Sequence, residues 1–332
     1  MKRYGNLYEK ICSIENIRLA HKNARKDKTF YKEVKMVDEN EDYYLGKILF
    51  TLIDKTFVNS KYTTFIKKDK GKIREIHKLP YYPDRIIHHA IVQILEPIWK
   101  PVLINDTYQS IKGRGTHKAK SKIQQRLRKC DLPYCLKIDV QKFYPSVNNT
   151  KMKGIIRKKI KCKDTLWLLD TIIDSTEGLP IGNYISQYLG NLYLTYLDHY
   201  IKEDLKIKNY YRYCDDMVLL HMDKEYLQYC LGKIKEYLGV LDLKIKSNYQ
   251  VFPTYVRGLD FIGFRFFKTY TLLRKSIALN FKRSFSRRYT KALNRVMSYW
   301  GWVKSADAFN LWQTKQKEIH ILKQEYKHES TS

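Results

Sequence analysis

The sequence has little acid and lacks the cysteine patterns that hold structural metals. Its 332 residues carry 34 Asp and Glu against 63 Lys and Arg, for a formal net charge of +29. The six cysteines form no C-x-x-C pair, and none is flanked by His at zinc-finger spacing, which excludes a zinc-built domain. Neither the apolar core of a signal peptide nor an apolar run of membrane-spanning length is present. Together with scattered free thiols, these absences predict a cytoplasmic protein without membrane segments.

The residues that are abundant predict a nucleic-acid partner. The net charge far exceeds what solubility requires, and a large polyanion is the simplest partner for such a field. Aromatic residues are also frequent, with 28 Tyr, 13 Phe and 5 Trp. Basic side chains bind phosphates and aromatic faces stack on bases, so the combination suits RNA or single strands. Composition alone leaves an alternative, which is a generally adhesive basic protein of the ribosomal or membrane-surface kind.

The hydrophobic patterns predict a mixed helix and sheet protein of two or three packed units. Apolar periodicity predicts helices over residues 6–26, after Pro83, and over 183–203 and 224–238. Strand patterns cover a hairpin over 61–79 and single strands over 134–140 and 259–267. From about residue 275 the sequence is helical, and an amphipathic basic helix is expected over 281–297.

Two acidic sites are expected on strands, and they predict a divalent metal centre. In "LKIDVQKFYPSV", Asp139 ends a buried strand; in "YRYCDDMVLL", Asp215 and Asp216 interrupt an apolar run. Adjacent buried carboxylates repel each other and lose hydration, so they need a cation. If the two strands are neighbours, the three acids can hold two Mg²⁺ ions and support phosphoryl transfer. The alternative is an exposed acid pair at a hairpin turn, which an isolated Asp-Asp usually is.

The order of these motifs resembles a reverse transcriptase over nearly the whole chain. The acid after the first strand is followed by "GLPIGNYISQ", "YCDD" and "FIGF". Upstream, "REIHKLPYYPDRIIHHAI" and "YQSIKGRGTHKA" resemble the blocks of the fingers. The resemblance implies an α+β right-hand polymerase with an antiparallel palm sheet and a helical thumb. Fingers would occupy residues 1–133, the palm 134–268 with a template-facing helix over 179–203, and the thumb 269–332.

The resemblance also implies roles for individual residues. Asp139, Asp215 and Asp216 would be catalytic and, with the carbonyl of Val140, would hold the two Mg²⁺ ions. The incoming dNTP would meet Lys67 (or Lys68), Arg74, Tyr144, Ile181 and Gly182. Template and primer would contact Gly182, Ser186, Gln187, Gly190, Tyr213, Gly263, Lys282, Arg283, Arg287 and Arg288. Lys244 or Lys246 would be the acid toward pyrophosphate, and the sequence does not choose between them.

Some of these residues have structural alternatives. The resemblance implies that Tyr144 would clash with a ribose 2′-hydroxyl, but Tyr144 also suits a core position beside Phe143. Gly182, Ser186 and Gly190 recur every four residues and predict one small-residue face on a helix. That face suits either a closely approaching nucleic-acid strand or tight packing on the sheet. The basic residues of the tail suit either duplex phosphates or a solvated helix face.

One departure from the common family pattern points to a subclass. Ile181 and Gln187 stand where most reverse transcriptases carry Gln and Pro, and this resembles the enzymes of diversity-generating retroelements. Those bacterial, archaeal or phage-encoded enzymes miscopy template adenines with an accessory variability protein, a small basic helical oligomer. A lost amide contact of about 1 kcal/mol would weaken discrimination between base pairs. No added nuclease or RNase H region is expected. The alternatives are a group II-like or defence-associated reverse transcriptase of ordinary fidelity, and a non-catalytic basic RNA-binding protein.

Overall fold

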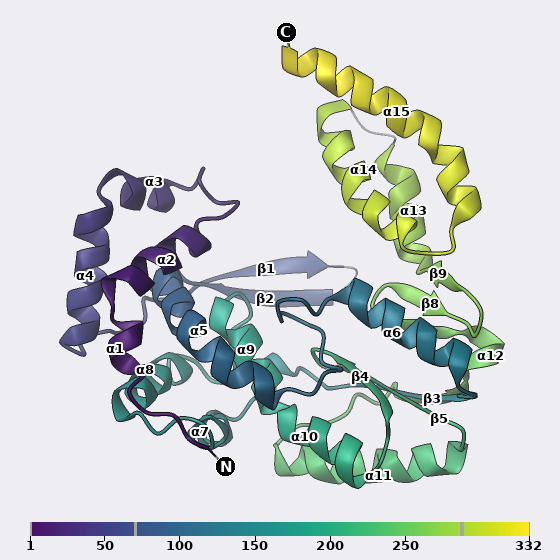
Figure 1. Cartoon of the computed structure of the whole chain (residues 1–332), viewed down its shortest axis with the longest axis horizontal. Helices are drawn as coiled ribbons and strands as arrows, with labels where there is room; N and C mark the ends of the chain where they lie inside the picture. Colours follow the sequence, from purple (N-terminus) through teal and green to yellow (C-terminus); the bar gives the residue numbers. More distant parts are fainter. Residues whose placement is uncertain (1, 70–71, 286–288, 332) are drawn as a thin grey trace. The chain divides into compact units, whose positions relative to one another are not determined.

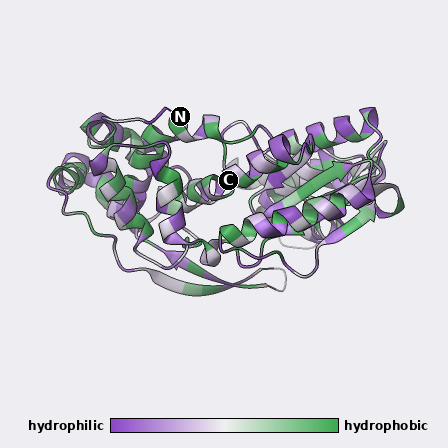
Figure 2. Cartoon of the chain, turned by 90° about the horizontal axis from the view of Figure 1, so that it is seen from below, coloured by the Kyte–Doolittle hydropathy of each residue, from purple (hydrophilic) through white to green (hydrophobic). Residues whose placement is uncertain are grey.

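The chain divides into two units, each assembled from three sequence segments. The computed structural model describes residues 2–69, 72–285 and 289–331. Unit 1 comprises Met1–Ile111, Asp139–Lys206 and Gly232–Ser247; unit 2 comprises Lys112–Ile138, Ile207–Leu231 and Asn248–Ser332. The helices of both units are banded with hydrophilic and hydrophobic residues (Figure 2), and the hydrophobic bands supply most of the buried core.

Unit 1 is largely helical. Its helices are α1 (Tyr8–Ile11), α2 (Ile14–Ala24), α3 (Lys32–Glu39), α4 (Glu41–Ile53), α5 (Ile86–Trp99), α7 (Asn149–Arg157), α8 (Lys163–Ile173), α9 (Tyr184–Tyr193) and α10 (Thr195–His199), and its short irregular turns are η1 (Tyr81–Arg85), η2 (Lys100–Val102), η3 (Tyr144–Ser146) and η4 (Tyr200–Asp204). The single helix predicted over 6–26 is wrong, because Ser13 caps a new helix by accepting a 3.2 Å hydrogen bond from Asn16 N. Asn16 then donates to Ala90 O at 3.1 Å, which ties α2 to α5.

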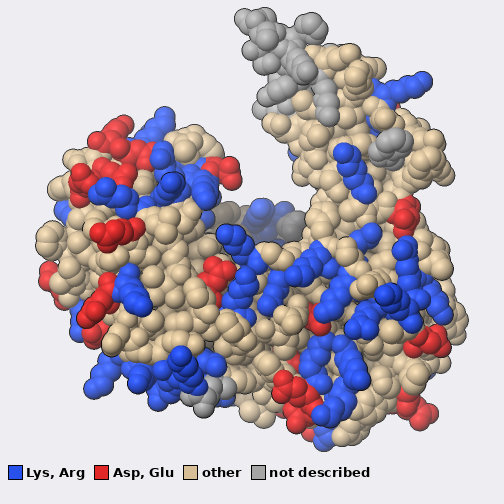
Figure 3. Space-filling model, viewed as in Figure 1, with Lys and Arg blue, Asp and Glu red and all other residues tan. Residues whose placement is uncertain are grey.

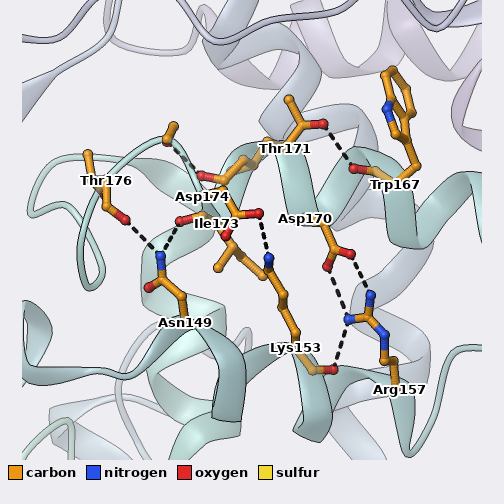
Figure 4. Close-up of polar contacts among 11 residues, drawn as sticks. Asn149, Lys153, Arg157, Trp167, Asp170, Thr171, Ile173, Asp174 and Thr176 are labelled. Atoms are coloured by element: carbon orange, nitrogen blue, oxygen red, sulfur yellow. Dashed lines mark hydrogen bonds and ion pairs between the residues drawn. The ribbon is translucent and has the colours of Figure 1, made fainter.

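The predicted hairpin over 61–79 is confirmed. Strand β1 (Thr63–Asp69) pairs antiparallel with β2 (Lys72–Lys78), with Thr63 opposite Lys78. Elsewhere in unit 1, polar contacts join α7 to α8 (Figure 4): Arg157 donates to Asp170 at 3.1 Å and Lys153 forms an ion pair with Asp174. These contacts make α7 and α8 a fixed pair.

The helix predicted over 179–203 begins late and is interrupted once. Residues 179–183 are not helical and α9 begins at Tyr184; one turn residue, Leu194, separates α9 from α10, and η4 continues to Asp204. Thr195 donates a 3.0 Å hydrogen bond from Oγ1 to Val102 O, so a contact distant in sequence accompanies the break.

Unit 2 contains a four-stranded sheet in the order β4 (Asn209–Tyr213), β5 (Asp216–His221), β3 (Tyr134–Asp139) and β6 (Gln250–Pro253). Helix α6 (Thr116–Lys129) precedes β3, and α11 (Lys224–Val240) follows β5 (Figure 1). A three-stranded sheet follows α12 (Thr254–Arg257), with β7 (Leu259–Phe261), β8 (Phe264–Phe266) and β9 (Thr271–Leu273). The single strand predicted over 259–267 is therefore wrong, because Ile262 and Gly263 adopt positive φ angles of 45° and 88° and turn the chain back.

Unit 2 ends in three helices that lie side by side (Figure 1): α13 (Lys275–Ser284), α14 (Tyr289–Lys304) and α15 (Phe309–Thr331). The continuous basic helix predicted over 281–297 is wrong. Helix α13 ends at Ser284, whose hydroxyl donates to Phe281 O at 2.6 Å, and α14 begins at Tyr289. Arg287 and Arg288 lie outside the described residues. Within the described part of the chain, no helix has both the length and the apolar character needed to cross a membrane.

Candidate active site

The acid pair lies at a tight hairpin. Strands β4 and β5 pair with Tyr213 opposite Asp216, so Cys214 and Asp215 form a two-residue turn. Such turns need a positive φ at their first position, and Cys214 has φ 59°. Asp216 begins β5, whereas Asp215 lies in the turn and not on a strand as predicted. Both acids are only partly exposed, so their charges are held away from bulk water.

The sheet order puts a strand that ends in an acid beside a strand that begins with one. Asp139 is the last residue of β3, and β3 is the neighbour of β5 in the sheet. Val140, the next residue, is fully buried and forms an isolated antiparallel bridge with Ile245. The prediction of a buried strand ending in an acid is therefore confirmed for β3.

Lys246 compensates the charge of Asp139. The ammonium of Lys246 forms an ion pair with Asp139 Oδ1, and the two side chains are 31% and 30% exposed. The backbone N–H of Lys246 also donates to Asp139 O at 2.9 Å. By contrast, the Lys244 side chain is exposed, and only its backbone carbonyl contacts this strand, through Gln141 N at 2.8 Å. Of the two lysines that the sequence left open, the structure places Lys246 at the acid.

Lys137 compensates the charge of Asp216, although Lys137 is not among the site residues predicted from the sequence. Its ammonium lies 3.6 Å from Asp216 Oδ2 and donates a 2.7 Å hydrogen bond to Asp260 O. The Asp260 carboxylate in turn accepts a 2.7 Å hydrogen bond from Arg274 Nε. The strand alternation gave a usable signal, since Lys137 stands two residues before Asp139 and so faces the same side of β3.

The donor set suits a hard divalent cation. Carboxylate and backbone carbonyl oxygens are the ligands that Mg²⁺ prefers, and Asp139, Asp215, Asp216 and Val140 offer only these. Across the described residues, no group of three or more His, Cys, Asp and Glu side chains is already assembled around a metal position. The ammonium groups of Lys246 and Lys137 partly offset the negative charges of Asp139 and Asp216. A bound divalent ion would offset the same charges.

The two basic residues predicted to bind the nucleotide triphosphate lie together on the β1–β2 hairpin. Lys67 is directly opposite Arg74 in the antiparallel register, and both side chains are exposed. Lys68 pairs with Ile73 instead, and successive strand residues face opposite sides. The hairpin therefore presents Lys67, and not Lys68, on the face of Arg74.

Gly182 is held against the end of the same hairpin. His77 N donates a 2.9 Å hydrogen bond to Ile181 O, and Gly182 adopts φ +127°. A Cβ on Gly182 would lie 2.5 Å from His77 O, so only glycine fits. Gly182 precedes α9, so its predicted place on one helical face with Ser186 and Gly190 is wrong. The strained turn, not a helix, sets its position.

Ser186 and Gly190 pack inside unit 1. Ser186 is 2% exposed, and a Cβ on Gly190 would lie 3.3 Å from the Phe143 ring. Tyr144 is half-buried and meets the Phe143 ring edge-on at 5.3 Å between centroids. The packing alternative therefore fits Ser186 and Gly190. Gln187 is exposed and accepts a 2.7 Å hydrogen bond from Ser110.

A cavity of about 440 Å³ borders Gly182 and Tyr184 and was not predicted. It is lined by Gly182, Tyr184, Lys28, Arg85 and His88, among others. Nε of Arg85 and Nε2 of His88 are buried and have no hydrogen-bond partner among the described residues. Burial, followed by the nearby Arg85 charge, lowers the pKa of His88 to about 3, so its imidazole is neutral. The sequence signal that could have indicated this cavity was the presence of polar residues such as His88 on the apolar face of α5.

The predicted template and primer residues of unit 2 lie on separate elements. Tyr213 ends β4, half-buried, and burial raises the pKa of its hydroxyl. Gly263 turns the β7–β8 hairpin, where a Cβ would lie 2.6 Å from the Trp302 ring. Lys282 and Arg283 are exposed near the end of α13. Basic side chains also gather over α6 (Figure 3), whose sequence contains Lys and Arg but no acid.

Comparisons with known proteins agree with this arrangement. Residues 66–266 match the model of a family described as "Reverse transcriptase (RNA-dependent DNA polymerase)". Protein YkfC of Escherichia coli is 26% identical over 153 residues, which are 42% of this chain and 40% of that protein. The group II intron-encoded protein LtrA of Lactococcus lactis is 25% identical over 179 residues, 49% of this chain and 29% of that protein. The matches thus span less than half the length of either relative.

Solved structures show the same fold. Apo telomerase from Candida tropicalis superposes with a TM-score of 0.53 at 12% identity, covering 86% of this chain and 64% of that chain. The likeness shows a right-hand polymerase fold with helices and antiparallel sheets, which confirms the predicted fold class.

Proposed function

Since the chain belongs to the reverse transcriptase family, we propose that it copies an RNA template into DNA by adding deoxynucleotides to a primer 3′-hydroxyl. The observation that carries this proposal is the sheet order, in which β3 ends in Asp139 beside β5, which begins with Asp216. Asp215 precedes Asp216 in the turn. The family match over residues 66–266 includes all three acids.

Asp139, Asp215 and Asp216, with the carbonyl of Val140, are the proposed ligands of two Mg²⁺ ions. When bound, such a pair of ions lowers the pKa of an attacking hydroxyl and stabilises the charge on the leaving phosphate oxygen. The chain's own contribution is to offset part of the negative charge of Asp139 and Asp216 with the ammonium groups of Lys246 and Lys137. Lys246 is also the proposed proton donor to pyrophosphate.

Substrate binding is assigned to unit 1 side chains. Lys67 and Arg74, paired across the β1–β2 hairpin, bind the triphosphate of the incoming nucleotide by charge. Tyr144 selects deoxynucleotides, because its ring occupies the space that a 2′-hydroxyl needs. The rigid Ile181–Gly182 segment faces the nascent base pair. The cavity beside it is lined by the cations Lys28 and Arg85, among others, whose charge suits a phosphate of the template strand.

Template and primer are held mainly through phosphates. The net charge of +29 supplies a strong, sequence-independent attraction for RNA and for an RNA–cDNA duplex. Lys282 and Arg283 on α13 are the proposed contacts in the helical thumb, and Gly263 brings the β7–β8 backbone to the primer end. Tyr213 and Gln187 complete this set.

Primer extension on a defined RNA in Mg²⁺ tests the proposal. We expect Asp139→Ala and Asp215→Ala to abolish synthesis while leaving RNA binding and melting temperature close to wild type. Asp131→Ala is the matched control, because Asp131 is an exposed acid with only a 3.6 Å ion pair to Lys268. Undiminished synthesis by Asp215→Ala would contradict the assigned site. RNA binding that is indifferent to Mg²⁺ and dNTP, with no product, would favour a non-catalytic RNA-binding protein.

The finer proposal is an enzyme of a diversity-generating retroelement, which works with an accessory variability protein and miscopies template adenines. Its support is the sequence Ile181-Gly182-x-x-x-Ser186-Gln187. The similarity to LtrA supports a group II-like enzyme of ordinary fidelity equally well. Sequencing the products with and without an accessory protein separates the two: errors concentrated opposite adenine favour the first, and accurate copies the second. In the first case, Ile181→Gln should lower the adenine errors, and an unchanged error spectrum would remove this physical account.

A further inference from the structure

A fully buried arginine contacts the turn that carries the acid pair. Arg212 lies on β4, paired with Met217 of β5, and its side chain is 0% exposed. Its Nη1 donates a 3.0 Å hydrogen bond to Cys214 O, the carbonyl that immediately precedes Asp215. The guanidinium is therefore bonded to the backbone of the turn itself.

The turn needs such support, because its first residue is in a conformation that side chains disfavour. Cys214 has φ 59°, in the left-handed region, where a residue other than glycine is strained. A hydrogen bond from a charged donor in a low-dielectric interior is stronger than a neutral one in water. Since the bond ends on Cys214 O, it stabilises the peptide plane that joins the strained residue to Asp215.

Packing alone does not explain an arginine at this position. Burying a guanidinium costs desolvation energy, and a well-packed apolar residue of similar length usually costs less. Tyr210, Tyr211 and Met217 around it already give β4 and β5 an apolar, buried character. The feature that arginine adds is a set of rigid donors in fixed geometry, one of which bonds to the turn.

We propose that Arg212 is a positioning residue that fixes the Cys214–Asp215 turn so that Asp215 and Asp216 are held ready to bind divalent metal. The proposal rests on the proposed polymerase function of this hairpin, and Arg212 itself does not touch substrate. Because the turn is preorganised, metal binding does not have to supply the free energy of ordering it. Loss of Arg212 should therefore weaken metal binding and slow the chemical step, with little effect on the affinity for template.

The test measures Mn²⁺ binding by electron paramagnetic resonance on the full chain, with a dideoxy-terminated primer–template and an incoming dNTP. Mg²⁺ half-activation and kcat are measured in parallel on an extendable primer. We expect Arg212→Met to weaken Mn²⁺ binding about tenfold and to raise Mg²⁺ half-activation by a similar factor, the size of one lost charged hydrogen bond. Arg212→Gln, which keeps an N–H donor, should lie between Met and wild type. KM for the template–primer should not change.

Met217→Ala is the matched control, because Met217 is buried directly opposite Arg212 but does not bond to the turn. It should lower the melting temperature and leave Mn²⁺ binding unchanged. Cys214→Asn supplies a second measure, since asparagine tolerates the left-handed region, and it should recover part of the Mn²⁺ affinity lost in Arg212→Met. If Arg212→Met does not fold, Arg212→Gln with and without Cys214→Asn decides the case.

Three results would overturn the proposal: wild-type Mn²⁺ affinity in both Arg212 variants, equal losses in Arg212 variants and Met217→Ala, or no recovery through Cys214→Asn. Failure of the proposed function gives a different result. The wild-type chain would then make no DNA at any Mg²⁺ concentration, whereas the effect of Arg212 on Mn²⁺ binding at the hairpin would still be measurable.

Discussion

Replacing Gly182 with alanine should destabilise unit 1 far more than the same change at Gly46 or Gly190. The added Cβ would lie 2.5 Å from His77 O, a backbone atom that cannot move without disturbing β2. Gly182 also has φ +127°, which alanine avoids. The strained backbone costs about 1–3 kcal/mol, and overpacking adds about 1–3 kcal/mol. Gly182→Ala should therefore lower the free energy of unfolding by roughly 2–6 kcal/mol.

Two other glycines calibrate this magnitude within the same unit. Gly46 lies inside α4 with no atom within 4 Å of an added Cβ, so Gly46→Ala should stabilise by about 0.5–1 kcal/mol. Gly190 is intermediate, because its Cβ would lie 3.3 Å from the Phe143 ring. Its alanine variant should lie between the other two.

Equilibrium urea unfolding of the three variants and wild type, followed by circular dichroism, measures the series. The expected order of stability is Gly46→Ala, wild type, Gly190→Ala and then Gly182→Ala. The Gly182→Ala variant should also extend primers more slowly than Gly190→Ala, because the Ile181–Gly182 segment is bonded to β2 through His77. A Gly182→Ala protein as stable as wild type would refute the claim that this backbone turn is specified by glycine.

Three further predictions concern chemistry and pH. Lys246→Met should slow single-turnover synthesis about 100-fold, and Lys244→Met should not, since of these two lysines it is Lys246 that forms the ion pair with Asp139; equal effects would contradict the assignment. Burial, then the nearby Arg85 charge, lowers the pKa of both His88 and His89 to about 3, so only the unfolded chain gains protons as the pH falls below 6.5. The free energy of unfolding should therefore decrease as the pH is lowered, by up to about 1.4 kcal/mol per pH unit for each histidine. When the urea midpoint is plotted against pH, His89→Phe should show a shallower slope than wild type. Tyr144→Ala should raise the use of ribonucleotides, measured as the ratio of kcat/KM values, and an unchanged ratio would remove Tyr144 as the selecting residue.

Local patterns in the sequence determined a large part of this protein. The alternation of strand residues and the Lys68–Gly71 turn predicted the β1–β2 hairpin, which is confirmed. The apolar run before Asp139 predicted β3, and the composition predicted a basic protein. These features were predictable because they depend on the propensities and periodicity of residues that are neighbours in the sequence.

Helix boundaries were less predictable, because distant contacts fix them. The apolar stripe over 183–203 continues through Leu194, yet the helix breaks where Thr195 bonds to Val102 O. The apolar stripe in the sequence over 281–297 likewise continues past Ser284, where α13 ends. A periodic pattern shows which face of a helix is buried, but the helix ends where tertiary hydrogen bonds and turns offer the backbone other partners.

The acids were visible in the sequence, whereas the groups that hold them were not. The order of motifs singled out Asp139, Asp215 and Asp216, but Lys137 and Lys246 reach Asp216 and Asp139 only through long-range pairing. The order β4-β5-β3-β6 brings residues about 80 positions apart into neighbouring strands, and no local pattern encodes that choice. Such pairing is decided by burial summed over the whole sheet, because closing a long loop costs entropy that only the packed core offsets. The sequence therefore singled out the candidate acids, and the tertiary structure decided which lysines contact them.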